Sequence, residues 1–394
     1  MYRLKAFTLI ELLIVIAIIA ILGSATVLVL NPVELMKQGR DGTRISDIEN
    51  IDKAVRMTLF NNTALLDSLP ATNIYLSLPS GSCPPNPPAG YTYVCNATAA
   101  NINKVDGTGW IPLSLQNMAS LPVDPGNGSY YAFVADPATK TFVVNAALES
   151  RKQTKIAASN DGGVDPLRFE KGNVVLWAQV IGIAGYWPLD EGSGTVAYDK
   201  SGNGNNGTWQ GTPSGTNGFY SPGSFSAYAG YFNKSNNNYV SIPDSPSLNF
   251  TTDYTAMAWF KLINPSGWNA IFGKEYWNAA TGWVITDTDP VNGVIQYYKG
   301  GGPSAYTDYF SFNSWHHIAI VNSNGAASVY FDGVFIRNTP VPISNSALSL
   351  FIGARHSNDG LSFTDCFNGS IYDARIYKRA VSGSEIQSIY NTEK

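Results

Sequence analysis

The sequence predicts two kinds of structure in one chain: an α+β region headed by a long N-terminal helix, and an all-β sandwich of jelly-roll kind behind it. Residues 7–30 form an almost unbroken apolar run, and apolar residues continue at helical spacing to residue 60. Short alternating runs separated by turn residues fill the second half. The 394 residues are enough for two domains beyond the helix.

The apolar run is long enough to cross a membrane and contains one charge. A bilayer core of roughly 30 Å needs about 20 apolar helical residues, and residues 12–30 supply them. Glu11 is the exception, and because a carboxylate in lipid costs about 2–3 kcal/mol, we expect a cationic partner. Arg3 and Lys5 precede the small Ala6, so cleavage after Ala6 would leave Phe7 with a free amine. A secretory signal or a plain anchor would not need Glu11.

The stretch KAFTLIELLIVIAIIAIL closely resembles the N-terminal signal and helix of type IV pilins and type II secretion pseudopilins, over residues 5 to about 60. The resemblance implies a leader at 1–6, a single-pass segment at 7–30 and a cytoplasmic-membrane precursor. It also implies that a prepilin peptidase cuts before Phe7, often with methylation, and that Glu11 pairs with the N-terminus of a neighbouring pilin subunit. The family usually has glycine where this chain has Ala6.

Residues 33–60 predict an amphipathic helix. Pro32, at its junction with the apolar run, is expected to bend the helix axis, and Gly39 and Gly42 are further weak points. Its apolar positions recur every three or four residues: Ile45, Ile48, Ile51, Val55 and Leu59.

A globular domain over 61–180 follows, and the clearest part is a hairpin of residues 130–135 and 141–148 around Asp136-Pro137. It resembles the globular part of pseudopilins. Some of those hold calcium near here, which makes Asp124 and Asp136 candidates, although turn capping is the favoured role. Cys83 and Cys95 bracket a Pro-rich loop that an oxidising envelope would close as a disulfide, or they stay unpaired, and Cys366 is left over.

Residues 183–394 predict the sandwich. Its expected strands are 239–242, 254–262, 282–286, 294–298, 315–321, 328–332, 348–352 and 369–377. Asp332-Gly333 marks a hairpin, and the capping-box spacing of Ser382 and Glu385 predicts one or two turns of helix at the end. The motifs GYWPLDEGSGTVAYDKSGNGNNG, WHHIAIV and FNGSIYDARIYKRAVSGSEI resemble the concanavalin A-like, laminin-G-like superfamily. That resemblance implies a module that binds glycans or proteins and a structural calcium ion in many members.

Calcium prefers oxygen ligands, which the segment DKSGNGNNG provides. Asp199, Asn203 and Asn205 are the candidate calcium ligands in this segment. The resemblance implies that Asp373 lies on the same sheet, which makes it a further candidate ligand. Asp199 alternatively caps a tight turn. Asp287 and Asp289 form a weaker second candidate site.

Glycan recognition uses exposed aromatic rings, and each candidate ring is alternatively part of the core. The candidates lie between residues 266 and 312: Trp268, Tyr276, Trp277, Trp283, Tyr306 and Tyr309. His316 and His317 are adjacent on a strand and should face opposite sides, so they cannot share a catalytic site. Paired carboxylates of a glycosidase are also missing from the predicted strands.

The function predicted is a non-enzymatic, pilin-like filament subunit that displays the sandwich for adhesion to a glycan or surface protein. The alternative is a pseudopilin, as tip or minor subunit, of a secretion or competence machine, and a glycan-cleaving enzyme is a third possibility. The net charge of −4 and the 14% of charged residues give no basic field for nucleic acid.

Overall fold

The computed structural model describes residues 9–18, 32–85, 87–88, 90–115, 117–126, 128–158, 161–224, 226–276, 278, 280–299, 302, 304–360 and 362–393. Three predicted site residues, Ala6, Phe7 and Trp277, lie outside these ranges. Residues 9–18 are helical, with Glu11 and its neighbours exposed. Within the described ranges, no helix combines the length and apolar character that a membrane crossing requires.

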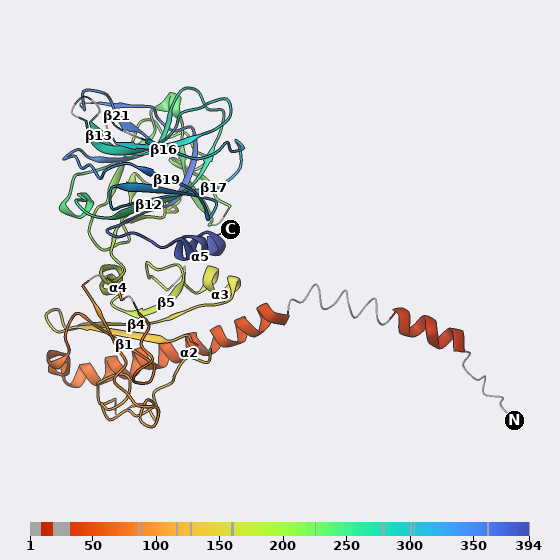
Figure 1. Cartoon of the computed structure of the whole chain (residues 1–394), viewed down its shortest axis with the longest axis vertical. Helices are drawn as coiled ribbons and strands as arrows, with labels where there is room; N and C mark the ends of the chain where they lie inside the picture. Colours follow the sequence, from red (N-terminus) through yellow and green to blue (C-terminus); the bar gives the residue numbers. More distant parts are fainter. Residues whose placement is uncertain are drawn as a thin grey trace.

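Two lobes make up the rest of the molecule (Figure 1). The helix lobe, residues 32–180, holds α2 (Pro32–Asn61), α3 (Arg151–Ile156), α4 (Val174–Val180) and a five-stranded sheet. Its strands, in the order β2-β1-β3-β4-β5, are β1 (Asn73–Leu76), β2 (Thr92–Val94), β3 (Tyr131–Asp136), β4 (Thr141–Ala147) and β5 (Arg168–Gly172). The predicted hairpin is β3 and β4, with Asp136 opposite Thr141.

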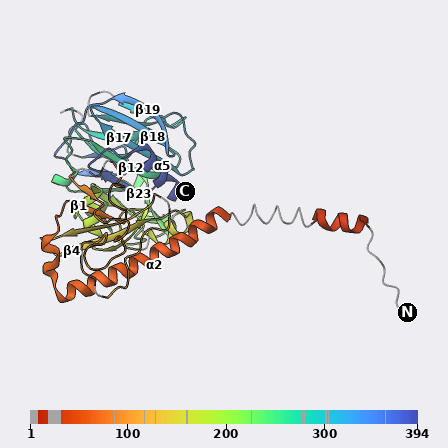
Figure 2. The ribbon, with the colours of Figure 1, turned by 60° about the horizontal axis from the view of Figure 1, so that its bottom comes forward.

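The helix α2 runs along one face of this sheet (Figure 2). Ile48, Ile51 and Val55 are fully buried there, together with Phe133 and Val144 of the sheet. The predicted apolar spacing therefore marks the buried stripe of the helix. Pro32 stands at the first position, where its missing N–H costs nothing. The helix continues without a break through its two glycines.

The opposite face of the sheet is covered by α4, which the sequence interpretation treated as part of a loop. Leu176, Trp177 and Val180 of α4 are buried against Ile74 and Val134 of the sheet. The short helix leads directly into the first strand of the second lobe. Its apolar run VVLWAQV is too short to show helical periodicity, which explains why this element was missed.

Cys83 and Cys95 are joined by a disulfide that closes the Pro-rich loop beside β2, with their Cα atoms 5.7 Å apart. Cys366 is a free cysteine buried in the second lobe.

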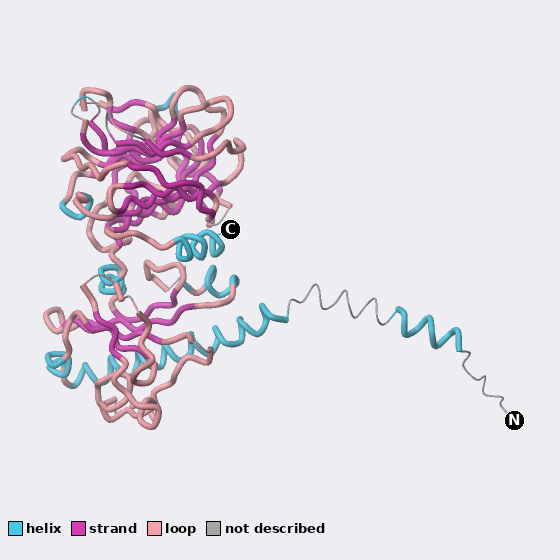
Figure 3. The backbone as a smooth tube through the Cα atoms, viewed as in Figure 1, coloured by secondary structure: helices cyan, strands magenta, loops and turns pink. Residues whose placement is uncertain are grey.

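The sandwich lobe, residues 183–393, consists of two main antiparallel sheets whose strands dominate Figure 3. The first has the order β19-β18-β17-β12-β23-β10-β9, with β6 also paired to β23, and the second has the order β16-β15-β14-β13-β20-β11-β8-β7. The first sheet comprises β6 (Ile183–Trp187), β9 (Tyr220–Pro222), β10 (Tyr228–Phe232), β12 (Tyr254–Leu262), β17 (His316–Ser323), β18 (Ala326–Phe331), β19 (Val334–Pro340) and β23 (Gly369–Tyr377). The second comprises β7 (Val196–Ala197), β8 (Gly207–Gln210), β11 (Tyr239–Ile242), β13 (Asn269–Tyr276), β14 (Thr281–Asp287), β15 (Ile295–Lys299), β16 (Ser304–Tyr306) and β20 (Leu350–Ile352). A separate hairpin pairs β21 (Arg355–His356) with β22 (Phe363–Thr364).

The predicted jelly-roll sandwich is confirmed, and the ends of β11, β12 and β23 coincide with the predicted runs. The terminal helix α5 (Gly383–Glu393) is longer than the one or two turns expected. Ser382 caps it by accepting the N–H of Glu385 at 3.2 Å, but the Glu385 carboxylate pairs with Arg379 instead of closing the capping box.

The two lobes share a buried apolar layer between the helix lobe and the outer face of the first sandwich sheet. Val164 and Ala178 come from the helix lobe, Met257 and Val321 from the sheet, and Ile386 from α5. Figure 1 shows α5 at this boundary. Because this layer is apolar and closed to water, the sandwich is packed directly on the helix lobe.

Near the same boundary, the half-buried carboxyl group of Asp161 lies close to the fully buried one of Glu170. Asp161 accepts the backbone N–H of Glu170 at 2.7 Å and that of Gly163 at 2.6 Å. Burial raises the pKa of Asp161 to about 7 and also raises the pKa of Glu170, which has Asp161 and Asp165 as like-charged neighbours. The positive charge of Lys171 partly offsets this increase in the pKa of Asp161.

We expect these acids to make the chain less stable as the pH rises from about 4 to about 7. Over that interval the unfolded carboxyls lose their protons while the folded Asp161 keeps its own, so the folded state binds more protons and its stability declines. Between pH 5 and pH 8 the loss of unfolding free energy due to Asp161 is about 2–3 kcal/mol. Urea unfolding followed by tryptophan fluorescence at pH 5 and pH 8 measures it. Asp161→Asn should flatten the profile, and an unchanged profile in that variant would contradict the assignment.

Candidate functional site

The clearest recess of the sandwich lies where the edge strand β16 of one sheet passes the edge strand β19 of the other. Its volume is about 520 Å³. We call it the Tyr309 recess, and its lining residues are Asp289, Val294, Tyr306, Thr307, Asp308, Tyr309 and Arg337. Tyr306 and Tyr309, two of the predicted ligand-binding aromatics, therefore lie in one site.

Local backbone pairing sets which side chains of this segment face outward. Thr307 is buried, and its Oγ1 accepts the N–H of Ile295 at 3.0 Å, while its own N–H donates to the carbonyl of Ile295. Phe310 is buried in the sandwich core. With Thr307 and Phe310 fixed inward, Asp308 and Tyr309 are left on the surface. Tyr309 leaves 74% of its surface exposed.

Arg337 extends from β19 across the recess and is held there by two contacts. Its guanidinium lies 4.4 Å from the ring centre of Tyr306, and Nη2 forms an ion pair with Asp308. The cation covers a face of Tyr306, whereas Tyr309 remains an open ring. Tyr306 thus orients the arginine and Tyr309 is the available stacking surface.

Asp289 lines the far wall from a tight turn between β14 and β15. Its carboxylate accepts the backbone N–H groups of Val291 and Asn292 at 3.0 and 3.1 Å. The hydrogen bond from the Asn292 side chain is the largest cause that lowers the pKa of Asp289, and these two backbone bonds lower it further. Asp287 is buried beneath it and accepts the N–H of Val294. Both acids predicted as a weaker cation site serve this turn.

The remaining described aromatic candidates lie elsewhere. Trp283 is 1% exposed in the sandwich core, where its ring packs on Tyr254 and Phe272. Trp268 is half-buried on the outer face of the second sheet, under the guanidinium of Arg355 at 5.1 Å. Tyr276 is half-buried at the end of β13. For Trp283, the core interpretation applies.

The two histidines face opposite sides of β17, as the alternation predicts. His316 packs with Phe260 and Phe331, and its Nδ1 lies 2.9 Å from Asp332 Oδ2. His317 is fully buried, and its ring packs against Trp259 on the outer face. Burial lowers the pKa of His317 to about 3, which keeps its ring neutral at physiological pH.

The predicted calcium segment is folded as a capped turn. Asp199 accepts backbone N–H groups from Tyr186 at 3.0 Å, Ser201 at 2.8 Å and Asn205 at 2.8 Å. Asn203 donates its side-chain amide to the carbonyl of Ile183 at 3.0 Å. The bonds to Asp199 engage both of its carboxylate oxygens, so the arrangement favours turn capping for Asp199.

Asp373 forms a buried ion pair with Arg375, at 2.8 Å to Nε. Burial raises the pKa of the Asp373 carboxyl, and Arg375 opposes that shift. Among the described residues, no three His, Cys, Asp or Glu side chains form a group suited to a metal ion. Calcium binding therefore stays a prediction. In the helix lobe, Asp136 caps its turn through Ala138, and Asp124 pairs with Arg44.

We expect Asp199→Ala to lower the free energy of unfolding by about 1–3 kcal/mol, because three partly buried N–H groups lose a charged acceptor. If Asp199 acts only as this cap, EDTA should leave the thermal midpoint of the wild-type protein unchanged. Thermal unfolding with EDTA, with calcium and with neither tests both statements. A midpoint that falls with EDTA and returns with calcium would support the cation-binding role instead.

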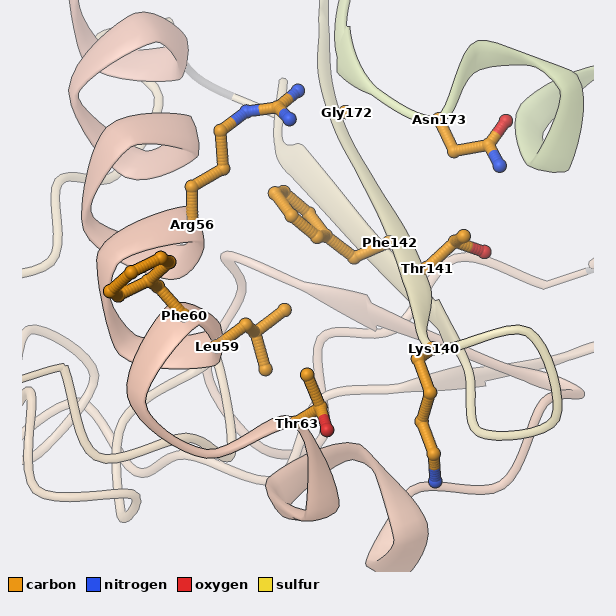
Figure 4. A pocket seen from close by; sticks show the side chains of 9 residues that line it. All are labelled: Arg56, Leu59, Phe60, Thr63, Lys140, Thr141, Phe142, Gly172 and Asn173. Carbon is orange, nitrogen blue, oxygen red and sulfur yellow. The ribbon is translucent and has the colours of Figure 1, made fainter.

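A second recess, of about 410 Å³, lies in the helix lobe between the end of α2 and β4 (Figure 4). Leu59, Phe60 and Phe142 form its apolar wall, and Arg56 and Lys140 stand at its rim. Arg56 is already paired with Asp52 and Lys140 with Asp67. The rim therefore has no excess charge to select a ligand.

Sequence interpretation missed two residues of the Tyr309 recess, Asp308 and Arg337. They are 29 positions apart, with Asp308 in the loop after β16 of one sheet and Arg337 in β19 of the other, so their pairing depends on the strand order. Within the described site, the one local feature of the sequence that points to Asp308 is its position next to Tyr309.

Comparison with protein families finds two matches in this chain. Residues 1–27 match the prokaryotic N-terminal methylation motif. Residues 234–387 match the concanavalin A-like lectin/glucanases superfamily. No curated protein matches the chain as a relative.

Solved structures resemble the sandwich in fold. Domain 4 of AbnA, an extracellular GH43 arabinanase from Geobacillus stearothermophilus solved with arabinotriose, is 21% identical at a TM-score of 0.41, over 54% of this chain and 98% of that one. The binding domain of Paraclostridial Mosquitocidal Protein 1 is 16% identical at 0.41, over 54% of this chain and 52% of that one. A botulinum neurotoxin type C structure is 14% identical at 0.40, over 54% and 52%. This chain thus spans about half the length of the two toxin chains.

The methylation motif accounts for the N-terminal apolar run, and the superfamily match covers most of the sandwich. The chain therefore joins the N-terminal methylation motif of type IV pilins and pseudopilins to a laminin-G-like domain of the concanavalin A-like lectin/glucanases superfamily.

Proposed function

We propose that this protein is a pilin-like filament subunit that displays its lectin-like sandwich for adhesion to a glycan or a surface protein. The observation that carries the proposal is the packing of the sandwich on the helix lobe through the shared apolar layer, with the Tyr309 recess on the open edge of the sandwich. Because the sandwich packs on the helix lobe, the position of the helix lobe in a filament also fixes the position of the sandwich. Binding without turnover is the mechanism proposed.

Assembly follows the order that the motif implies. A prepilin peptidase removes residues 1–6 from the membrane-anchored precursor, and the subunit then joins others through its N-terminal helix. Many copies on one filament raise avidity even where each recess binds weakly. A short envelope-bound complex would instead indicate the pseudopilin role.

The test compares cells that express the full chain with cells that express a chain ending at Gly182, which keeps the helix lobe. We expect filaments in both strains and retention on host surfaces and glycan arrays only with the full chain. Arms with calcium and with EDTA show whether retention needs the cation, and assays for released sugar test the absence of turnover. Equal retention of both strains would contradict adhesion through the sandwich.

A further inference from the structure

We propose that the Tyr309 recess binds one neutral sugar ring through a pair of adjacent hydroxyl groups. This inference rests on the adhesive function proposed above and specifies its ligand. Three properties of the recess carry it: one open aromatic ring, an acceptor beside a donor, and a negative formal charge.

The ring of Tyr309 is the stacking surface. It is 74% exposed on the surface segment between the buried Thr307 and Phe310. The carbon-bound hydrogens on one face of a sugar ring pack on such an aromatic face, while the sugar hydroxyls point outward. Arg337 already covers one face of Tyr306, which is 47% exposed, so Tyr309 is the more open of the two rings for stacking.

The ion pair of Asp308 and Arg337 supplies both hydrogen-bonding roles in adjacent positions. A hydroxyl group donates one hydrogen and accepts others, so one sugar hydroxyl can donate to the Asp308 carboxylate while its neighbour accepts from the Arg337 guanidinium. Tyr306 keeps the guanidinium in place, which reduces the entropy lost when a ligand binds.

The charge of the lining discriminates between sugar classes. Asp289 and Asp308 contribute two negative charges and Arg337 one positive charge, which leaves a formal charge of −1. A sialic acid carboxylate or a sulfate would have to compete with Asp308 for Arg337 and approach Asp289 as well. A sugar without charge meets neither obstacle.

The experiment applies full-length protein, as filaments or in detergent micelles, to immobilised glycans ending in galactose, glucose or mannose. Parallel spots end in sialic acid or carry sulfate. We expect binding to the uncharged set, lost after periodate oxidation under conditions strong enough to cleave the vicinal diols of the sugar ring itself. Tyr309→Ala should weaken binding about ten-fold, and Asp308→Asn should weaken it too, whereas Tyr309→Phe should retain it.

Tyr198→Ala is the matched control, because Tyr198 is another exposed sandwich tyrosine with a nearby cation, Lys200, and lies outside the recess. It should bind as the wild type does. Stronger binding to acidic glycans, or binding that survives Tyr309→Ala, would overturn this inference and leave adhesion intact. Filaments that are retained on no glycan and no cell surface would overturn both proposals.

Discussion

Replacing Arg44 with alanine should lower the free energy of unfolding of the helix lobe by about 3–5 kcal/mol. Arg44 is fully buried in α2 and pairs with Asp41 at 2.9 Å, with Asp124 at 2.7 Å and with Glu149. Removing it leaves buried carboxylates without their cation, which is the costly way to break an ion pair. Urea unfolding of the full chain in detergent measures the loss.

The same cluster of ion pairs connects residues 40–44 of α2 to the loops that carry Asp124 and Glu149. Asp41 also accepts the backbone N–H groups of Glu149 and Ser150, and Arg40 pairs with Glu149 at 2.5 Å. The hydrogen bond from Arg40 is the largest cause that lowers the pKa of Glu149 to about 2. The orientation of the helix on the sheet thus depends on charges as well as on the apolar stripe.

Arg56→Ala is the matched control for Arg44. Arg56 also lies on α2 and pairs with an acid, Asp52, but its side chain is largely exposed, so water already screens the pair. Its loss should change stability by less than about 1 kcal/mol. Equal effects of the two substitutions would show that the buried cluster does not stabilise the lobe.

Replacing Glu11 with alanine should leave removal of the leader intact and reduce assembled filament at least ten-fold. Glu11 is the one charge in residues 7–30, and the described helix at 9–18 exposes it among apolar side chains. In an apolar filament core, a carboxylate is costly unless it pairs with a cation. We propose that the cation is the N-terminal amine of Phe7 on a neighbouring subunit. Immunoblots of sheared filaments and of membranes measure assembly and processing separately.

Glu11→Gln separates the charge from the size of the side chain and should fail in the same way. Leu12→Ala changes the next exposed position, keeps the carboxylate and should assemble. Normal filament yield from Glu11→Ala would remove the assembly role of that residue.

Regular spacing explains what could be predicted from the sequence. The helix α2 repeats its apolar stripe from Ile45 to Leu59, and β12 and β23 are long strands bounded by turn residues, so these elements follow from local pattern. The helix α4 has seven residues, and its helical state depends on the sheet face that it covers. Such tertiary stabilisation leaves no local periodicity to detect.

The candidate site was predictable only in part for the same reason. Exposed tyrosines in a loop are a local feature, and Tyr306 and Tyr309 were identified by it. The contribution of Arg337 requires knowing that β19 and β16 are neighbouring edges of two sheets. Asp199 illustrates the opposite case, since an acid in a glycine-rich turn suits a cation and a backbone cap equally well until the hydrogen bonds are known.

We propose that the sandwich is carried on the surface of a filament built from this chain. Immunogold electron microscopy with an antibody against residues 183–394 tests this proposal directly. We expect gold along filaments that extend from the cell, and loss of those filaments in Glu11→Ala. Label confined to the cell envelope, or filaments without label in cells that express the protein, would contradict it.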